Sequence, residues 1–293
     1  MSSMVCIIIV NYNGRDDTVE CIRSIKAISY SNYRIIVIDN ASAEKPSLSE
    51  DTYVLQNAEV IVSDSNLGFA GANNLGIETA MKYDSQYILL INNDTVVEPD
   101  FLSQMLLTYE STDNVGIVTG KIYYYGEPDV IWFGGSYYDE RRFEMKIDGI
   151  GKKDCEEYSK KKEIPFATGC LWLISMSMIR TVGKMCEDYF LYYEDADYCN
   201  RLVKSGMRII YEPKAVIYHK ESRSTKKGSN EYHYYNIRNY YIYIQRFCDI
   251  NSRYRAYINR IYIDCKQMIQ GRIPARIVFR AWKDFIWKKY GMI

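Results

Sequence analysis

Residues 86–94 read QYILLINND, an apolar run that ends in two asparagines and an aspartate. A short run that is apolar throughout is typical of a strand buried on both faces of a sheet. Residues 70–82 before it and 100–110 after it carry apolar side chains at helical spacing. A buried strand between two such helices predicts an α/β sheet whose strands are mostly parallel.

The same alternation covers the first hundred residues. Residues 4–10, 33–39 and 59–63 form three more apolar runs, and residues 15–28 have a helical pattern. Together these elements predict a doubly wound α/β domain, in which helices flank both faces of the sheet.

The pattern is less regular after residue 125. The elements expected there are strands at 115–125, 166–176, 208–211 and 215–218, hairpins and loops over 126–165, and a helix at 195–205. Residues 222–231 form a polar, Gly-containing loop that is a candidate for mobility. We therefore predict one domain over residues 1–231 and a helical extension over 232–293.

Composition narrows the class of protein. The chain has 293 residues and no net charge, and it contains no apolar run of the roughly 18–20 residues that a membrane span requires. The apolar run at residues 5–10 is too short for a signal peptide, so we expect a cytoplasmic protein. None of the eight cysteines forms a Cys-x-x-Cys pair, which argues against zinc-ribbon and thioredoxin sites and favours reduced, buried thiols.

Asparagine or aspartate follows each of the four predicted strands. The four polar stretches begin at Asn11, Asp39, Asp64 and Asn92. Such residues are common in turns and helix caps, but in an open α/β sheet the carboxyl ends of the strands meet in one ligand-binding crevice. The chain lacks both the Gly-x-Gly-x-x-Gly fingerprint and the phosphate-binding P-loop, so dinucleotide and P-loop interpretations lose their main support.

Two carboxylate clusters stand out in this arrangement. Asp94 comes directly after a buried strand, where a carboxylate can hold Mg²⁺ or Mn²⁺ against a diphosphate. Glu194, Asp195 and Asp197 lie at the start of a predicted helix. One or two of them could simply complement the helix dipole, but crowded carboxylates beside a ligand also suit a general base. His219 ends a strand and is either structural or a metal ligand.

Several long stretches resemble glycosyltransferase family 2, especially its rhamnosyltransferase-like branch. The stretches are IIIVNYNG (7–14), IIVIDNAS (35–42), NLGFAGANNLGI (66–77), YILLINNDTVVEPDFL (87–102), ATGCLWLIS (167–175), YFLYYEDADYCNRLVKSG (189–206), VIYHKES and the later YNIRNYY. The resemblance implies a GT-A fold and transfer of a sugar, with inversion, from a nucleoside diphosphate. It also implies a nucleotide-sugar half at about residues 1–125 and an acceptor half at about 126–231.

The resemblance assigns roles to individual residues. Asp195 matches the usual base, with Glu194 beside it, and His219 matches a position that often completes the metal site with Asp94. The first aspartate of the family's Asp-x-Asp motif is Asn92 here, which leaves Asp94 as the carboxylate ligand for Mg²⁺ or Mn²⁺. The residues expected to contact the nucleotide sugar are Asn11, Tyr12, Asn13, Asp39, Asn40, Asn66, Gly68, Asn73, Asn92, Asn93 and Asp94.

The acceptor side is assigned less directly. We expect Gly169, Cys170 and Trp172 to border the acceptor, with Trp172 either stacking on a sugar or packing in the core. Asp197 either holds the acceptor or positions its helix. The base would deprotonate an acceptor hydroxyl while the metal neutralises charge on the departing diphosphate.

The C-terminal extension is basic and aromatic. From residue 251 onward the chain has ten Lys and Arg residues and only two acidic residues, Asp264 and Asp284. This mixture suits the interface of an anionic membrane, and an acceptor carried on a polyprenyl lipid, but a helical cap with a solvated basic face explains it equally well. No nucleic-acid recognition motif accompanies the charge. We expect peripheral attachment to the inner face of the plasma membrane, and the oligomeric state stays open, a homodimer included.

The leading interpretation is an enzyme that extends a cell-surface polysaccharide such as a capsule or O-antigen. L-rhamnose from dTDP-rhamnose is the first choice of donor, and a UDP-hexose or UDP-N-acetylhexosamine is close behind. A non-catalytic nucleotide-sugar-binding or scaffold subunit is the alternative of another class, and a nucleotidylyltransferase is a third, for which residues 11–15 make a poor Gly-rich loop.

Overall fold

The computed structural model describes residues 2–221 and 228–292. Its N-terminal half is a parallel sheet with helical connections, as predicted. The elements are β1 (Val5–Asn11), α1 (Arg15–Lys26), β2 (Tyr33–Asp39), β3 (Ala58–Val62), α2 (Gly68–Ala80) and β4 (Tyr87–Asn92). β1, β2 and β4 are almost wholly apolar and buried at their centres, so they form the core of the domain, while β3 is a half-exposed edge strand.

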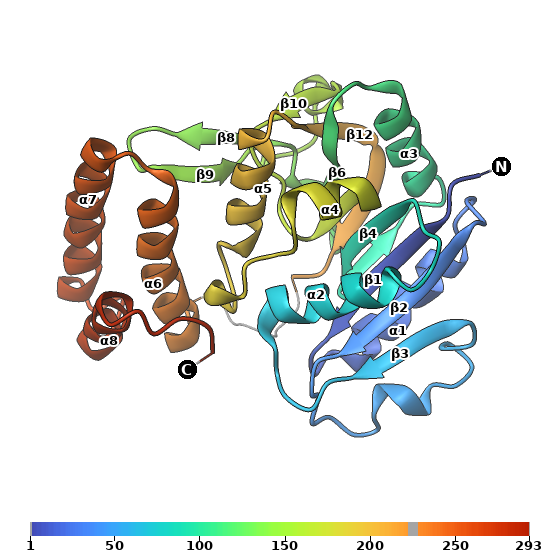
Figure 1. Cartoon of the computed structure of the whole chain (residues 1–293), viewed down its shortest axis with the longest axis horizontal. Helices are drawn as coiled ribbons and strands as arrows, with labels where there is room; N and C mark the ends of the chain where they lie inside the picture. The colour runs from blue at the N-terminus through green and yellow to red at the C-terminus, as the bar shows by residue number, and fades with distance from the viewer. Residues whose placement is uncertain (1, 222–227, 293) are drawn as a thin grey trace.

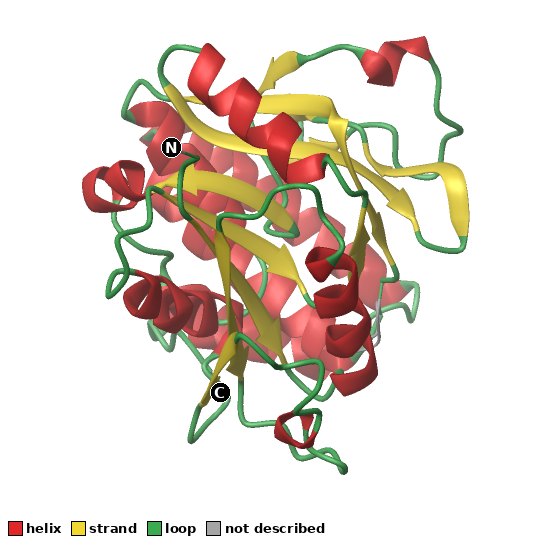
Figure 2. Cartoon of the chain, turned by 90° about the vertical axis from the view of Figure 1, so that its right-hand side faces the viewer, coloured by secondary structure: helices red, strands yellow, loops and turns green. Residues whose placement is uncertain are grey.

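The strand order places a topological switch point between β1 and β4. β1 pairs in parallel with β2 on one side and with β4 on the other, and β3 lies beyond β2. The crossovers through α1 and α2 therefore run in opposite directions, and helices cover both faces of the sheet (Figure 2). In the register, Asn11 lies opposite Asp39, and Val10 opposite Asn92. The polar strand ends thus meet at one edge, as expected.

The second half extends this sheet with mixed pairing. Its elements are β5 (Thr95–Val97), α3 (Phe101–Ser111), β6 (Val115–Tyr124), β7 (Glu127–Phe133), β8 (Ser136–Asp139), β9 (Glu144–Ile147), β10 (Lys162–Ile164), β11 (Leu171–Ser175), α4 (Met176–Val182), α5 (Glu194–Lys204) and β12 (Arg208–His219). β11 runs antiparallel between β4 and β6, while β12 is parallel to β6. β8 and β9 form a separate hairpin.

Two details differ from the sequence-based expectation. Residues 208–219 form one strand, not two, because a register shift between Glu212 and Val216 absorbs the irregularity around Pro213. At this shift the backbones approach closely: a Cβ at Gly120 would lie 2.2 Å from the Ala215 carbonyl oxygen. β5 was not expected, and it is only three residues long, too short for a periodic signal. It pairs with the end of β12, so Thr95 lies opposite His219.

Three helices follow: α6 (Asn230–Phe247), α7 (Ile250–Ile269) and α8 (Ala275–Ile286). They lie together at the end of the molecule away from the sheet (Figure 1). α8 packs chiefly on α6, and the break between α7 and α8 falls at Gly271 and Pro274. The loop expected over 222–231 is described only from residue 228, since 222–227 lie outside the described residues.

Two expectations from composition can be compared with the structure. Among the described helices, none has the length and apolar character needed to cross a bilayer. All eight cysteines are free thiols, in agreement with the expectation of reduced cysteines. Four of them, Cys6, Cys21, Cys170 and Cys199, are buried.

Candidate active site

The end of β1 is joined to the end of β4 through a shared threonine. Asn11 is fully buried, and its Oδ1 accepts hydrogen bonds from the Thr18 hydroxyl at 2.9 Å and from the Gly14 N–H at 3.3 Å. The Asn93 amide donates to the same hydroxyl at 2.9 Å. Asn11 also donates to Ser42, after β2, at 3.1 Å. Asn11 and Asn93 therefore hold the carboxyl ends of β1 and β4 together. The side-chain oxygen and nitrogen of Asn11 are both engaged in these hydrogen bonds.

The rim of the crevice is formed by the turns after β1 and β2. Asn13 has a left-handed backbone (φ 52°), and its Oδ1 accepts from the Ala43 N–H at 2.8 Å. Asp39 Oδ1 accepts from the Ser42 N–H at 3.1 Å. Tyr12 is 37% exposed on this rim. The two turns are therefore locked to each other, with Tyr12 at the surface.

The turn into α2 is bound to the end of β2 and to the segment before α5. Asn40 donates to Asn66 Oδ1 at 2.9 Å and accepts from the Leu67 N–H at 2.8 Å. Gly68 has φ +70°, and a Cβ there would lie 2.3 Å from the Phe190 carbonyl oxygen, so only glycine fits.

Asn73, expected to contact the nucleotide sugar, lies in α2, a helix that is buried on nearly all sides. It is 2% exposed and donates to the Phe69 carbonyl at 2.9 Å within its own helix. Its contact with a nucleotide sugar stays a prediction.

Asp94 and His219 meet at the carboxyl end of the sheet. The β5–β12 pairing brings them together, and His219 Nε2 lies 3.1 Å from Asp94 Oδ1. Both residues are buried, at 7% and 6% exposure. Trp132 packs edge-on against the imidazole, with ring centroids 4.4 Å apart. Within the described residues, His219 Nδ1 is buried without a hydrogen-bond partner.

This pair has the chemistry and spacing of two ligands to one divalent ion. Two donor atoms at about 2.1 Å from an octahedral ion and at a right angle to each other lie about 3.0 Å apart. The Asp94 oxygen and His219 nitrogen have that separation. Over residues 2–221 and 228–292 no third His, Cys, Asp or Glu joins them as a metal-binding cluster. The residues present therefore fit an ion whose other ligands come from a bound diphosphate and water.

Asp195 lies in the first turn of α5 with a perturbed acidity. Its Oδ2 accepts from the Gly169 N–H at 3.3 Å, and its Oδ1 from the Ala196 N–H at 2.8 Å. Burial raises the pKa of Asp195 to about 6, although these hydrogen bonds lower it. The pKa of the adjacent Glu194 is raised well above its usual range, first by burial and then by the Asp195 charge. Asp195 is therefore mostly ionised near neutral pH yet able to accept a proton, which suits general-base catalysis.

A dipeptide links the two carboxylate sites. The Gly169 N–H contacts Asp195, and the carbonyl of the next residue, Cys170, accepts from the Asn92 N–H at 3.0 Å, two residues before Asp94. Burial, followed by the Asp94 charge, raises the pKa of the Cys170 thiol. The two residues before β11 thus hold Asp195 close to the end of β4 that leads into Asp94.

Comparison with known proteins identifies this arrangement. The family model described as glycosyl transferase family 2 matches residues 6–183, more than half of the chain. The chain belongs to glycosyltransferase family 2. The enzyme class expected from the sequence is thereby confirmed, and inverting transfer is consistent with this family.

Several named proteins are similar to most of this glycosyltransferase. The low-salt glycan biosynthesis hexosyltransferase Agl10 of Haloferax volcanii is 25% identical, with 96% of this chain and 86% of that protein aligned. The rhamnosyltransferase WbbL of Escherichia coli is 28% identical, with 75% of this chain and 86% of that protein aligned. The mannosyltransferase PcManGT from Pyrobaculum calidifontis, solved with GDP-Man and Mn²⁺, shares the fold at a TM-score of 0.59, with 12% identity over 99% of this chain and 88% of that one. The expectation of a GT-A fold is confirmed.

All four residues expected to border the acceptor are buried in this glycosyltransferase. Trp172 is fully buried, tilts against Tyr198 at 5.4 Å and donates to the Ala167 carbonyl, so it packs in the core and cannot stack on a sugar. Cys170 is 2% exposed. Of the expected acceptor residues, Gly169 is the one in contact with Asp195.

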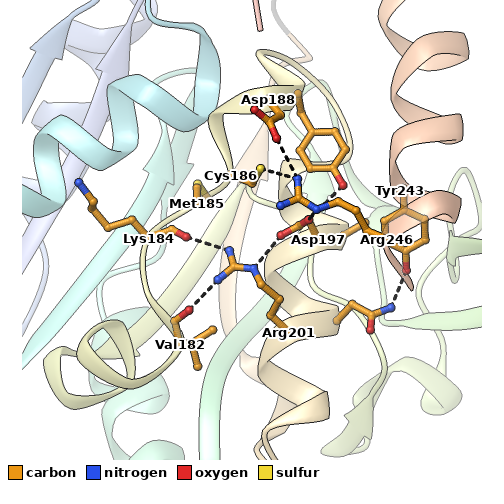
Figure 3. Close-up of polar contacts among 12 residues, drawn as sticks. Val182, Lys184, Met185, Cys186, Asp188, Asp197, Arg201, Tyr243 and Arg246 are labelled. Carbon is orange, nitrogen blue, oxygen red and sulfur yellow. Dashed lines mark hydrogen bonds and ion pairs between the residues drawn. The ribbon is translucent and has the colours of Figure 1, made fainter. Parts of the chain in front are cut away.

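Asp197 is also withdrawn from the acceptor. It is fully buried, and its Oδ1 lies 2.7 Å from Arg201 Nε, while its Oδ2 lies 3.4 Å from Arg246 Nε (Figure 3). The Tyr189 hydroxyl donates to the same Oδ2 at 3.0 Å. Because both oxygens are engaged, Asp197 ties α5 to α6, and its interpretation as an acceptor ligand is corrected in favour of a structural role.

The sequence reasoning missed a clamp from α6 on the segment before α5. Asn239 Nδ2 lies 2.8–2.9 Å from the carbonyl oxygens of Tyr189, Leu191 and Tyr192, and Arg238 donates to Tyr189 as well. Both clamp residues are fully buried. The signal was the Arg-Asn pair inside the otherwise aromatic stretch YNIRNYY, since a buried polar pair in an apolar helix requires partners.

Proposed function

We propose that this glycosyltransferase moves a sugar from a nucleoside diphosphate donor to an acceptor hydroxyl, with Asp195 as the base. The observation that carries the proposal is the placement of Asp195 in the first turn of α5, where the Gly169 and Ala196 N–H groups donate to its carboxylate at 3.3 and 2.8 Å. Burial raises its pKa to about 6, which leaves it ionised at neutral pH yet able to take a proton. Proton transfer to Asp195 would make the hydroxyl a better nucleophile as it attacks the anomeric carbon.

We propose further that Asp94 and His219 hold a divalent ion, Mg²⁺ or Mn²⁺. When bound, such an ion neutralises charge on a departing diphosphate. The 3.1 Å separation of the two ligand atoms supports this assignment, and PcManGT was solved with Mn²⁺. Asn13, Asp39 and Tyr12, on the rim, and Asn92, beside Asp94, are the residues we propose for direct contact with the nucleotide sugar. Asn11, Asn40, Asn66, Gly68 and Asn93 would shape the crevice around it.

The donor sugar is proposed from the named relatives. L-rhamnose from dTDP-rhamnose remains the first choice, because WbbL, aligned over three quarters of this chain, is named a rhamnosyltransferase. A UDP-hexose or UDP-N-acetylhexosamine donor is the second candidate, since Agl10 is named a hexosyltransferase. We propose a growing cell-surface polysaccharide as the acceptor. A polyprenyl-linked acceptor would hold the enzyme at the inner face of the plasma membrane.

The proposed domain division is also refined by contacts. We keep residues 1–231 as the catalytic domain and 232–293 as the extension. However, Asn239 and Arg246 of the extension contact the segment that leads into Asp195. We therefore propose that the extension is a working part of the catalytic unit.

A thermal-shift panel tests the proposal. The protein would be heated with dTDP-rhamnose, UDP-glucose, UDP-N-acetylglucosamine and the matching diphosphates, with and without Mn²⁺ or Mg²⁺. Stabilisation should follow RT ln(1 + [L]/Kd) for the true donor, and should require the metal. If no nucleotide stabilises the protein under any metal condition, the scaffold alternative replaces the enzyme proposal.

A further inference from the structure

Helix α7 has two apolar faces, of which only one is covered. On the covered face Ala256 is fully buried, and the Tyr257 ring lies against Tyr241 and Phe285. The other face is a stripe of exposed side chains at helical spacing. The stripe consists of Ile250, Tyr254, Ile258, Ile261, Tyr262 and Ile269. Ile258 is 69% exposed and Ile269 83%. A continuous stripe of this kind marks a contact surface.

Helix α8 presents an exposed face of mixed character. Its inner side, with Val278 and Ala281, is fully buried. Its outer side carries Arg276, Phe279, Arg280, Lys283, Ile286 and Trp287, all exposed. On α7, the exposed Arg255 and Lys266 flank the apolar stripe. The two outer faces, which we call the C-terminal surface, therefore combine large apolar side chains with basic ones.

The acidic side chains of these helices point inward. Asp264 is fully buried, with Arg260 Nε at 2.8 Å and the Tyr241 hydroxyl at 3.1 Å. Asp284 is 5% exposed and accepts from the Tyr234 hydroxyl at 3.1 Å. Over the described residues 250–292 the C-terminal surface consequently exposes no acidic side chain. Its charge is complementary to an anionic partner alone.

We propose that the C-terminal surface docks the enzyme onto an anionic lipid bilayer. The exposed aromatic and aliphatic side chains would enter the headgroup region, and the basic side chains would contact lipid phosphates. Figure 1 places α7 and α8 at the outer end of the molecule, where a flat surface can reach them. Attachment would be peripheral, since none of the described helices could span the bilayer.

A second copy of the chain fits this surface less well. In a symmetric dimer the same patch faces itself, so a patch that exposes basic and no acidic side chains over the described residues 250–292 would bring like charges into one interface. Like charges brought together across an interface oppose association. An anionic bilayer supplies the opposite charge over the whole patch, and this is why we favour it as the occupant.

Vesicle binding tests the proposal. It deepens the proposed function by naming the surface that would bring the enzyme to a lipid-linked acceptor, but the measurement needs no catalysis. Wild type should co-sediment with phosphatidylcholine vesicles containing about 30% phosphatidylglycerol, and binding should weaken with salt. The double variant Arg276→Glu, Lys283→Glu should bind at least about 30-fold more weakly, because each basic residue near the surface contributes roughly fivefold.

A control variant with the same change in net charge tests whether vesicle binding depends on the C-terminal surface or only on the net charge of the protein. Arg23→Glu, Lys82→Glu reverses two exposed basic residues of the sheet domain and should bind vesicles as wild type does. Ile258→Ser should weaken binding without changing the metal-dependent thermal shift produced by nucleotide. The proposal is overturned if wild type does not bind anionic vesicles or if both double variants lose binding equally. It is also overturned if Ile258→Ser converts a dimer to a monomer, because the occupant is then a second copy.

Discussion

His219 Nε2 lies 3.1 Å from Asp94 Oδ1, although the two residues come from opposite halves of the domain. The pairing of β5 with β12 sets this distance, since Thr95 is in register with His219. Trp132 closes one side of the imidazole. The pair is thus positioned by backbone register and packing, so it is preorganised for a ligand that neither residue could hold alone.

Replacing Asp94 should remove the metal-dependent part of nucleotide binding. For Asp94→Asn we expect loss of the Mn²⁺-dependent thermal shift with nucleoside diphosphate and a fall in kcat of about 100-fold or more, because stabilisation of the leaving group is lost. His219→Ala should act in the same direction. Asp84→Asn, an exposed carboxylate just before β4, is the control and should keep the full shift. An undiminished Mn²⁺ response in Asp94→Asn would place the ion elsewhere.

The rate of transfer should depend on an ionised Asp195. Because burial raises the pKa of this carboxyl to about 6, we expect kcat/KM to fall tenfold per pH unit below that value and to level off above it. A pH profile of wild type between pH 5 and 8 checks this (the range follows the pKa of about 6). Asp195→Asn should lose about 10²–10⁴-fold in rate. Glu194→Gln, which resembles the protonated glutamic acid, should lose far less.

The same pKa predicts that Asp195 costs stability at neutral pH. Folding raises the pKa of this carboxyl from 3.8 to about 6. Its contribution to the free energy of unfolding is therefore fully present below the unfolded pKa and is lost as the pH rises through the folded pKa. Asp195→Asn should therefore raise the free energy of unfolding at pH 7 by up to about 3 kcal/mol. Urea unfolding at pH 7 and pH 4 measures it. The gain should fall to roughly 0.5 kcal/mol at pH 4, just above the unfolded pKa, and an equal gain at both pH values would point to a cause other than ionisation.

The sequence predicted the fold best where an element was long and its pattern of apolar residues was uninterrupted. The buried strands of the first hundred residues and the carboxyl-end cluster were found because apolar runs stop abruptly at Asn11, Asp39 and Asn92. β5 was missed because three residues carry no period, and its partner strand was split in two because Pro213 interrupts the pattern.

Side-chain direction limited the prediction of the site. Trp172 and Asp197 stand in stretches that resemble the family, yet both point into the interior. Whether a residue beside a site faces it depends on register and on distant partners such as Arg246, and neither is visible in a single sequence. The same limit hid Asn239, whose partners lie on a segment about fifty residues earlier.

The clamp from α6 should position the catalytic helix. Phe190, Tyr192 and Tyr193 have left-handed backbones, which bulky residues rarely adopt, so the segment before Asp195 needs external support. For Asn239→Ala we expect kcat to fall about 10–100-fold, with little change in donor KM, because the base moves while the donor site does not. The acid limb of the pH profile should shift too, since Asp195 changes its surroundings.

Asn236→Ala is the matched control for this clamp. It removes an asparagine from the same helix whose side-chain amide donates to the Tyr232 carbonyl of that helix, at 2.8 Å, and not to the segment before α5. Its kcat and pH profile should be those of wild type. If the two variants lose activity equally, or if Asn239→Ala changes stability alone, α6 has no positioning role.

Replacing Asp197 should lower the free energy of unfolding of the whole protein. Asp197→Ala would leave Arg201 and Arg246 facing each other across a buried site without the shared carboxylate (Figure 3). Removing one member of a buried ion pair costs about 3–5 kcal/mol, and chemical denaturation would measure it. Asp188→Ala also removes a partner of Arg246, at 3.2 Å, but Asp188 is about half exposed, so its loss should cost about 1 kcal/mol at most. A variant at Asp197 with wild-type stability and a raised KM for the acceptor would instead restore Asp197 as an acceptor ligand.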